Sequence, residues 1–248
     1  MLIEERYKLI LDYLNAHGTA TVAELTETLG SSEATVRRDL TALGGMGKLL
    51  KVRGGATAAE SEYSFEERSV ETKEKLFAAE KTEIAKYAAG TVRRDDFIFI
   101  DAGTTTEKMI DFITERDITV VTNCFTHAKK LAQRGFRVMI VGGQIKLATE
   151  AVVGAESVSM MEKFNFTKCY LGANGISLSR GFTTPDIDEA NVKNAAFRKS
   201  YVTYVLADHS KFDKVSSVTF APVSGVCIIT DVLPDRYRDQ CIAKEVLK

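Results

Sequence analysis

The chain has 248 residues, of which 45% are hydrophobic and 27% are charged, a composition typical of a globular protein with a core and not of a disordered one. Its 33 Lys and Arg residues nearly balance its 34 Asp and Glu residues, and this formal net charge of -1 argues against general polyanion binding by the whole surface. The four cysteines form no Cys-x-x-Cys pair and no apolar run approaches the roughly 18 residues of a membrane helix, which argues against zinc ribbons, disulfide frameworks and membrane proteins. The N-terminal residues MLIEER do not resemble a signal peptide, so we expect a cytoplasmic protein with reduced thiols and no membrane partner.

Charge is unevenly distributed along the chain. Residues 35–55 carry five basic residues against one acidic residue, a local net charge of +4, whereas residues 58–76 carry six glutamates against three basic residues, a local net charge of -3. The stretch 54–61 between them is small and polar, with no helix or strand period. We therefore expect an N-terminal domain over residues 1–57, an acidic connector over 58–74 and a second domain over 75–248.

Three short helices are expected in the first 45 residues. Apolar residues recur at helical spacing from Leu2 to Leu14. Thr21 can cap a second helix that Gly30 breaks, and Ser32 can cap a third. The third helix has a narrow apolar stripe and an outward face with arginine, as in a helix that enters a DNA groove. Residues 48–53 predict a small hairpin after it, which completes a winged helix-turn-helix.

The candidate DNA contacts lie on this third helix and on the wing. A basic helix face is equally typical of an ordinary solvated surface, so these residues alone leave DNA binding and a small helical subdomain as even alternatives. The candidates are Ser32, Ala34, Thr35, Arg37, Arg38, Thr41, Lys51 and Arg53.

The segment TVRRDL at 35–40, followed by GKL at 47–49 and VRGGA at 52–56, resembles the signature of the DeoR family of bacterial transcriptional repressors. The resemblance covers nearly all of residues 3–57 and implies that this domain binds DNA. One departure is the pair Gly44–Gly45, where the family usually has a helix-favouring run. Glycine costs about 1 kcal/mol relative to alanine inside a helix, so we expect the recognition helix to end early and the wing to be loose.

The second domain alternates short apolar runs with helical patterns. This alternation predicts an α/β fold in which helices cover both faces of a parallel sheet. The expected strands are 97–100, 118–121, 138–141, 169–171, 202–206 and 226–229. The expected helices lie near 105–114, 124–134, 188–200 and 235–246.

Glycine and polar residues follow five of these strands, at the edge where ligands bind in such sheets. Residues 101–106 combine Gly103, which lets the backbone approach a ligand, with a helix start suited to a phosphate. Residues 208–211 supply a carboxylate for sugar hydroxyls and a lysine for a phosphate. Any one of these loops is more simply explained as a tight turn, but five at one edge predict a ligand site.

Other kinds of site lack their motifs. No Gly-x-Gly-x-x-Gly follows a strand, and neither a phosphate-binding loop with Gly-Lys-[Ser/Thr] nor a Gly-x-Ser-x-Gly elbow occurs. The three histidines are far apart and have no ligand spacing. We therefore expect no cofactor and no metal site.

The strand ends also resemble the DeoR-family sensor domain, over roughly residues 75–232. The quoted segments are 100–105, 122–123, 142–143, 181–184 and 207–212. The resemblance implies a fold similar to ribose-5-phosphate isomerase and the coenzyme A transferases, and a phosphorylated sugar as effector. With the strand-end glycines, the predicted effector-binding residues are Lys81, Asp101, Gly103, Thr104, Thr105, Asn123, Gly142, Gly143, Gly175, Thr183, Glu189, Asp208 and Lys211.

Two functions fit these features. The first is a repressor of a carbohydrate-utilisation operon, a dimer or tetramer that binds double-stranded operator DNA and responds to a phosphorylated sugar. Fructose 1-phosphate is the first expectation, because residues 101–107 resemble the fructose-operon branch of the family. The alternative is a sugar-phosphate isomerase or transferase with an accessory DNA-binding domain. An isomerase needs a positioned base, and loop 172–175 carries no carboxylate, but Asp101, Glu189 and Asp208 keep this alternative open.

Overall fold

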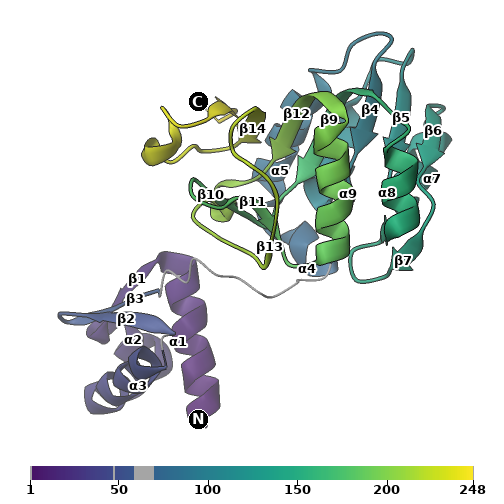
Figure 1. The fold of residues 1–248 in the computed structure, drawn as a ribbon. Coiled ribbons are helices and arrows are strands. Elements are labelled where there is room, and N and C mark those ends of the chain that lie inside the picture. Colours follow the sequence, from purple (N-terminus) through teal and green to yellow (C-terminus); the bar gives the residue numbers. More distant parts are fainter. Residues whose placement is uncertain (1, 47, 59–69, 248) are drawn as a thin grey trace. The chain divides into compact units, whose positions relative to one another are not determined.

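The computed structural model describes residues 2–46, 48–58 and 70–247 and divides the chain into two compact units, residues 1–62 and 63–248. The N-terminal unit has three helices and a three-stranded antiparallel sheet in the order β1-β3-β2 (Figure 1). Its elements are α1 (Ile3–His17), β1 (Thr19–Thr21), α2 (Val22–Leu29), α3 (Glu33–Gly45), β2 (Leu49–Val52) and β3 (Gly55–Ala58). The predicted helices and hairpin are confirmed, and the short strand β1 adds a third strand to the wing.

Side-chain caps start α2 and α3 where the sequence predicts them. The Thr21 hydroxyl accepts the N–H of Glu24 at 3.2 Å, and the Glu24 carboxylate accepts the N–H of Thr21 at 2.7 Å, which is a complete capping box. Gly30 ends α2 in the left-handed region at φ 57°, and the Ser32 hydroxyl accepts the N–H of Thr35 at 3.3 Å. These caps fix the turn between the two helices.

The expectation that α3 ends early is wrong, because α3 continues through Gly44 and Gly45. Leu40 and Leu43 on α3 and Leu49 on β2 are all buried in the core of this unit. Burial of such side chains is worth about 1.5–3 kcal/mol each, which outweighs the helix propensity of two glycines.

The C-terminal unit is built on a seven-stranded sheet in the order β15-β14-β12-β9-β4-β5-β6, and every neighbouring pair in it is parallel. The predicted parallel α/β fold is therefore confirmed. Its strands are β4 (Phe97–Ile100), β5 (Thr119–Thr122), β6 (Arg137–Ile140), β9 (Phe166–Gly172), β12 (Ser200–Leu206), β14 (Val226–Thr230) and β15 (Ile242–Glu245).

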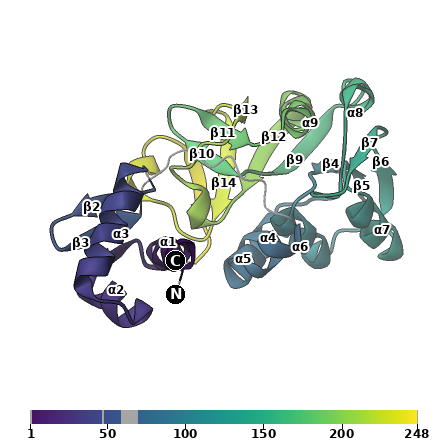
Figure 2. The same cartoon turned by 90° about the horizontal axis from the view of Figure 1, so that it is seen from below.

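Helices cover both faces of this sheet. The helices of the unit are α4 (Val70–Lys75), α5 (Ala78–Ala89), α6 (Thr104–Phe112), α7 (Phe125–Gln133), α8 (Ala155–Met161) and α9 (Ile187–Arg198). Helices α8 and α9 lie on one face in Figure 1, and α5, α6 and α7 group on the other in Figure 2. None of the described helices is long and apolar enough to cross a membrane.

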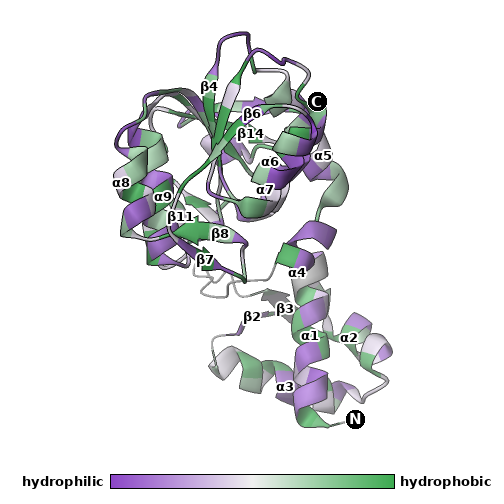
Figure 3. Ribbon diagram, turned by 90° about the vertical axis from the view of Figure 1, so that its right-hand side faces the viewer, coloured by the Kyte–Doolittle hydropathy of each residue, from purple (hydrophilic) through white to green (hydrophobic). Residues whose placement is uncertain are grey.

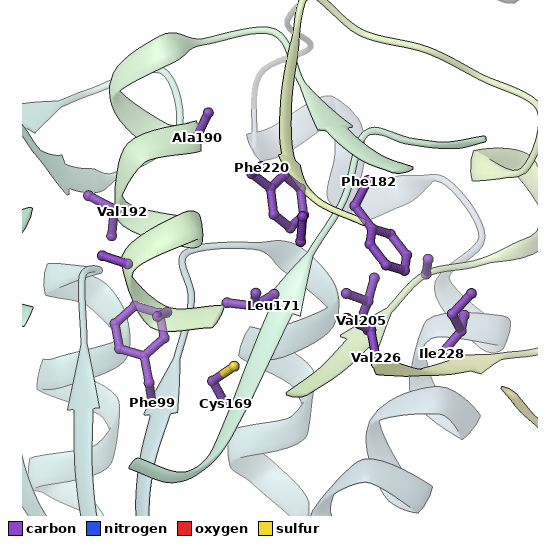
Figure 4. Packing of buried hydrophobic residues seen from close by; sticks show 14 of the residues in the cluster. Phe99, Cys169, Leu171, Phe182, Ala190, Val192, Val205, Phe220, Val226 and Ile228 are labelled. Atoms are coloured by element: carbon purple, nitrogen blue, oxygen red, sulfur yellow. The ribbon is translucent and has the colours of Figure 1, made fainter. Parts of the chain in front are cut away.

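The sheet has a buried cluster on each face, because successive side chains of a strand point to opposite faces. Phe99 packs with Cys169 and Leu171 beneath α9, as Figure 4 shows, whereas Ile98 and Ile100 belong to a second buried cluster with α5 and α6. In Figure 3 the strand β4 is coloured as hydrophobic, whereas α1 carries both colours. Two-sided burial explains why the strands are continuous apolar runs.

Smaller elements around the sheet were not predicted, and one predicted helix is absent. The sequence pattern did not show the hairpin β7 (Gln144–Lys146) and β8 (Ala151–Val153), or the antiparallel sheet of β10 (Gly175–Ser177), β11 (Gly181–Thr184) and β13 (Val218–Ala221). The prediction of a helix near 235–246 is wrong, because a single 3-10 turn, Asp235–Tyr237, is followed there by β15. Strand β15 pairs with β14, with Ile242 opposite Cys227, so pairing with a distant strand overrides the local pattern.

We expect Gly55→Ala to destabilise the N-terminal unit. A Cβ at Gly55 would lie 2.1 Å from the carbonyl oxygen of Ala20, so β1 and β3 would have to separate. Such overpacking costs about 1–3 kcal/mol in the free energy of unfolding. Gly45→Ala is the matched control, since a Cβ there meets nothing within 4 Å, and it should raise stability by up to about 1 kcal/mol. Calorimetric unfolding of the full chain measures both; an unchanged Gly55→Ala protein would contradict the close approach.

Candidate functional site

In the N-terminal unit, the outward face of α3 and the wing border a groove of about 500 Å³. Five of the predicted DNA contacts line it: Arg37, Arg38, Thr41, Lys51 and Arg53. Ser32, Ala34 and Thr35 lie at the start of α3, and Ser32 and Ala34 are exposed. The structure thus brings the candidates from two separate sequence segments onto one surface.

The wing is tied to the recognition helix, contrary to the expectation of a loose wing. The Lys51 ammonium donates to the Thr41 hydroxyl at 2.8 Å, and that hydroxyl donates to the carbonyl of Arg37 at 2.7 Å. Arg38 and Arg53 are exposed and have no ion-pair partner in the described ranges. Their guanidinium groups are therefore available to DNA phosphates or bases.

A bidentate ion pair fixes the other side of α3. Arg6 of α1 donates to both carboxylate oxygens of Asp39, at 2.7 and 3.0 Å, and Asp39 is only 1% exposed. Bidentate guanidinium–carboxylate pairs fix direction as well as distance. The acidic residue of the TVRRDL segment therefore points inward and orients the helix.

In the C-terminal unit, a pocket lies beyond the carboxyl ends of three neighbouring strands, β4, β9 and β12. It has room for about 80 Å³. Besides these strand ends, α4, α5 and α9 contribute to its wall. The lining residues are Val70, Lys73, Lys81, Ala102, Gly103, Thr104, Thr105, Thr106, Thr149, Gly172, Ala173, Asn174, Glu189, Lys193, Leu206, Ala207, Asp208 and Lys211.

One part of the pocket is suited to an anion. Helix α6 begins there after Gly103, and no side chain caps its first N–H groups. Lys211 also lines the pocket, and its ammonium has no ion-pair partner within the described residues. Free N–H groups at a helix start together with an unpaired lysine form an anion-binding arrangement.

Lys81 is a second cation in the same wall. Its side chain is 3% exposed and donates to the main-chain carbonyl of Lys73. Burial first, and the nearby lysines Lys211, Lys108 and Lys73 to a smaller extent, lower the pKa of Lys81 to about 8, although Asp208 raises it in part. A bound anion would stabilise the charged form of this lysine.

A buried ion pair also contributes to the pocket wall. Lys193 of α9 is 4% exposed and contacts the carboxylate of Asp101, which also accepts the N–H of Gly172 at 3.0 Å. Lys193 donates further to the carbonyl of Gly172 at 3.2 Å. Complete burial raises the pKa of Asp101, and Lys193 offsets part of this rise. Asp101 does not line the pocket; it holds Lys193, which does.

Glu189 belongs to a second polar cluster in this wall. Its carboxylate accepts the Thr149 hydroxyl at 2.6 Å and the Lys146 ammonium at 3.1 Å. Burial opposes ionisation, but Lys193, Thr149 and Lys146 together outweigh it and lower the pKa of Glu189. Asp208, at the end of β12, accepts the N–H of Ser210 at 3.1 Å and also its hydroxyl. Ionised carboxylates in a pocket can accept hydrogen bonds from sugar hydroxyls.

Several predicted residues lie outside the pocket. Asn123 is buried and accepts the N–H of Ala102 at 2.9 Å, so it supports the loop before α6. The Thr183 hydroxyl accepts the N–H of Ser216 at 2.8 Å, and a Cβ at Gly175 would meet the carbonyl oxygen of Lys214 at 2.3 Å. Gly142 and Gly143 follow β6 and do not line the pocket either. The predicted residues brought together are Lys81, Gly103, Thr104, Thr105, Glu189, Asp208 and Lys211.

Sequence analysis missed Lys73, Thr149, Asn174 and Lys193 in the pocket wall. Lys193 lies in helix α9, which has many polar residues, and a lysine in such a helix is usually exposed. The local sequence therefore gave no sign that Lys193 is buried. No group of three or more His, Cys, Asp or Glu side chains in the described part of the chain is arranged to hold a metal ion.

Comparison with known proteins identifies both units. The family described as "DeoR-like helix-turn-helix domain" matches residues 6–62, and the one described as "DeoR C terminal sensor domain" matches residues 76–232. Among curated relatives, the "Uncharacterized HTH-type transcriptional regulator FruR" of Bacillus subtilis is 39% identical over 99% of both chains. The "Lactose phosphotransferase system repressor" of Streptococcus mutans is 34% identical, covering 94% of this chain and 93% of that protein.

Solved structures match only part of the chain. A ribose 5-phosphate isomerase A from Methanocaldococcus jannaschii is 13% identical with a TM-score of 0.39, and the match covers 53% of each chain. The eIF2B delta subunit from Chaetomium thermophilum is 18% identical with a TM-score of 0.43, covering 56% of this chain and 50% of that one. The chain thus spans about half the length of these structures. The curated relatives, by contrast, align along nearly the whole chain and are regulators, which removes the enzyme alternative. This chain belongs to the DeoR family and is a DNA-binding transcriptional regulator with a C-terminal sensor domain.

Proposed function

We propose that the protein is a cytoplasmic repressor of a carbohydrate-utilisation operon, and that a phosphorylated sugar bound in the sensor pocket reduces its affinity for operator DNA. The observation that carries this proposal is the pocket itself, whose wall combines the uncapped start of α6 and Lys211 with the carboxylates of Asp208 and Glu189. A phosphate matches the first group and sugar hydroxyls match the second.

The proposed effector contacts follow from this arrangement. The phosphate takes the N–H groups of Thr104 and Thr105 together with Lys211 and Lys81, and the sugar hydroxyls contact Asp208, Glu189 and Lys193. Fructose 1-phosphate is the first candidate. Its binding and the binding of operator DNA are linked, so each must weaken the other by the same factor.

On DNA, α3 is proposed to enter the major groove, with Arg38 at base edges and Lys51 and Arg53 of the wing on phosphates. One winged unit covers little DNA, so we propose a dimer or tetramer on repeated half-sites. Light scattering of the free protein tests this assembly, and a monomer at working concentration contradicts it.

Measurements at several salt concentrations should distinguish base contacts from phosphate contacts. About four contacts from each subunit of a dimer neutralise roughly eight phosphates. A plot of the logarithm of the DNA-binding constant against the logarithm of salt concentration should therefore have a slope of about -7. Arg38→Ala should lose about 1–3 kcal/mol of discrimination between operator and random DNA. Lys51→Ala should weaken both equally and make the slope shallower by about 1. Lys163→Ala, on the exposed surface of the other unit, controls for charge. An affinity that barely changes with salt contradicts the interface.

Lys211→Ala should weaken sugar-phosphate binding by about 10- to 150-fold, because a charge-assisted hydrogen bond is worth about 1.5–3 kcal/mol. Lys214→Ala is the matched control, since it removes the same charge from the same loop outside the pocket. Operator affinity without sugar should stay unchanged in both variants. Titration of labelled operator with fructose 1-phosphate measures the response. Equal half-maximal concentrations for Lys211→Ala and wild type contradict the assignment of the site.

The pH dependence of effector binding should report Lys81. Since the pKa of this lysine in the free protein is about 8, it is charged below pH 8 and loses its proton above. A phosphate prefers the charged form, so affinity should fall above about pH 8, by up to about tenfold for each pH unit. Lys81→Arg keeps its charge throughout and should show a flat profile between pH 7.5 and 9.5. Isothermal titration measures both, and a flat wild-type profile contradicts a contact between Lys81 and the phosphate.

A further inference from the structure

Helix α4 forms part of the wall of the sensor pocket. Val70 and Lys73 line the cavity, although α4 has only six residues and buries none of them. Helices α4, α5 and α6 lie next to one another in Figure 2. Helices this short are not stable by themselves, so α4 exists because its neighbours hold it.

A residue of the pocket wall contacts the end of α4. The Lys81 ammonium donates to the carbonyl of Lys73, which belongs to the last turn of α4, where carbonyl groups have no partner within the helix. A cation at this end also complements the helix dipole. Lys81 therefore caps α4 while lining the cavity on which α4 rests.

With α4 in place, the cavity is smaller than most ligand pockets. It has room for about 80 Å³, whereas ligand pockets usually span about 300–1,000 Å³. The other walls are strand ends of the central sheet, the helices α5, α6 and α9, the turn at Thr149 between β7 and β8, and the loop 208–211. The three helices bury core residues, Asp208 is 1% exposed, and Thr149 is buried and bonded to Glu189. Additional room is most readily gained by moving α4.

The connection between α4 and α5 is strained and contacts the loop 208–211 of the pocket wall. Phe77, which precedes α5, has a left-handed backbone at φ 53°, a conformation that costs a non-glycine residue about 1–3 kcal/mol. Its ring packs edge-on against His209, with ring centres 4.9 Å apart. His209 lies between Asp208 and Lys211, so this connection contacts the loop that carries two pocket residues.

We propose that α4 is a lid on the sensor pocket, held closed by Lys81, and that a phosphorylated sugar opens it by taking Lys81 from the carbonyl of Lys73. The inference rests on the proposed function, since it needs a phosphate in this pocket. A phosphate dianion is a stronger acceptor for an ammonium than a neutral carbonyl, which gives the exchange its direction. In sequence, α4 is the first described element after β3, so the lid is the part of the sensor nearest along the chain to the DNA-binding unit.

The lid predicts that weakening α4 strengthens effector binding. Glu74 is exposed on α4 and does not line the pocket. Glu74→Gly and Glu74→Ala remove the same charge, but glycine destabilises the helix by about 1 kcal/mol relative to alanine, which converts to about fivefold in the open fraction. Because apparent affinity scales with the open fraction, the glycine variant should bind about fivefold more tightly than the alanine variant.

Isothermal titration of the full chain tests this difference, with fructose 1-phosphate or tagatose 6-phosphate as probe, whichever the wild type binds more tightly. Lys129→Gly and Lys129→Ala on α7 form a control pair, away from the pocket, that should not differ. Equal affinities of the two Glu74 variants, or weaker binding by Glu74→Gly, contradict the lid but leave the proposed function intact. Failure of the wild type to bind either sugar phosphate contradicts the proposed function and the lid with it.

Hydrogen exchange on the same proteins gives a second measurement. With bound probe, the amides of residues 70–75 should exchange at least fivefold faster, while those of residues 103–107 at the start of α6 should exchange more slowly. Slower exchange in both segments means that α4 closes over the ligand, which contradicts opening but supports the site.

Discussion

The buried ion pair between Asp101 and Lys193 holds the sensor pocket together. Asp101 directly follows β4, Lys193 belongs to α9, and both contact the backbone of Gly172 at the end of β9. Removing one partner of a buried pair leaves an uncompensated charge and costs about 3–5 kcal/mol. Folding and the shape of the pocket therefore depend on the same interaction, which joins residues 92 positions apart.

The chemistry of the pocket follows from the topology of the sheet. In a parallel sheet the strands end at one edge and the following helices begin there, so helix N–H groups gather at that edge. In this protein α6 begins at this edge, next to the ends of β9 and β12. The pocket wall therefore combines helix N–H groups and lysines with carboxylates.

Local patterns predicted the elements whose own residues determine them. The caps at Thr21 and Ser32 and the apolar strand at 97–100 depend on neighbours in sequence, and the structure has them at those positions. Other features depend on interactions between residues far apart in sequence, and local patterns did not predict them. Residues 242–245 form a strand because β14 offers a free edge, and Lys193 is buried because Asp101 pairs with it. Likewise, Asn123 and Asp101 are near the pocket as expected, yet their polar atoms are bound to the protein itself.

The inward direction of Asp39 has a consequence for how such a regulator can diverge. Asp39 and the buried residues Val36, Leu40 and Leu43 form the side of α3 that anchors it to the rest of its unit, with Arg6 on Asp39. The outward positions 34, 38 and 41 are exposed. Duplicated copies of the gene can therefore exchange these outward residues and acquire new target sequences, while the orientation of the helix is inherited unchanged.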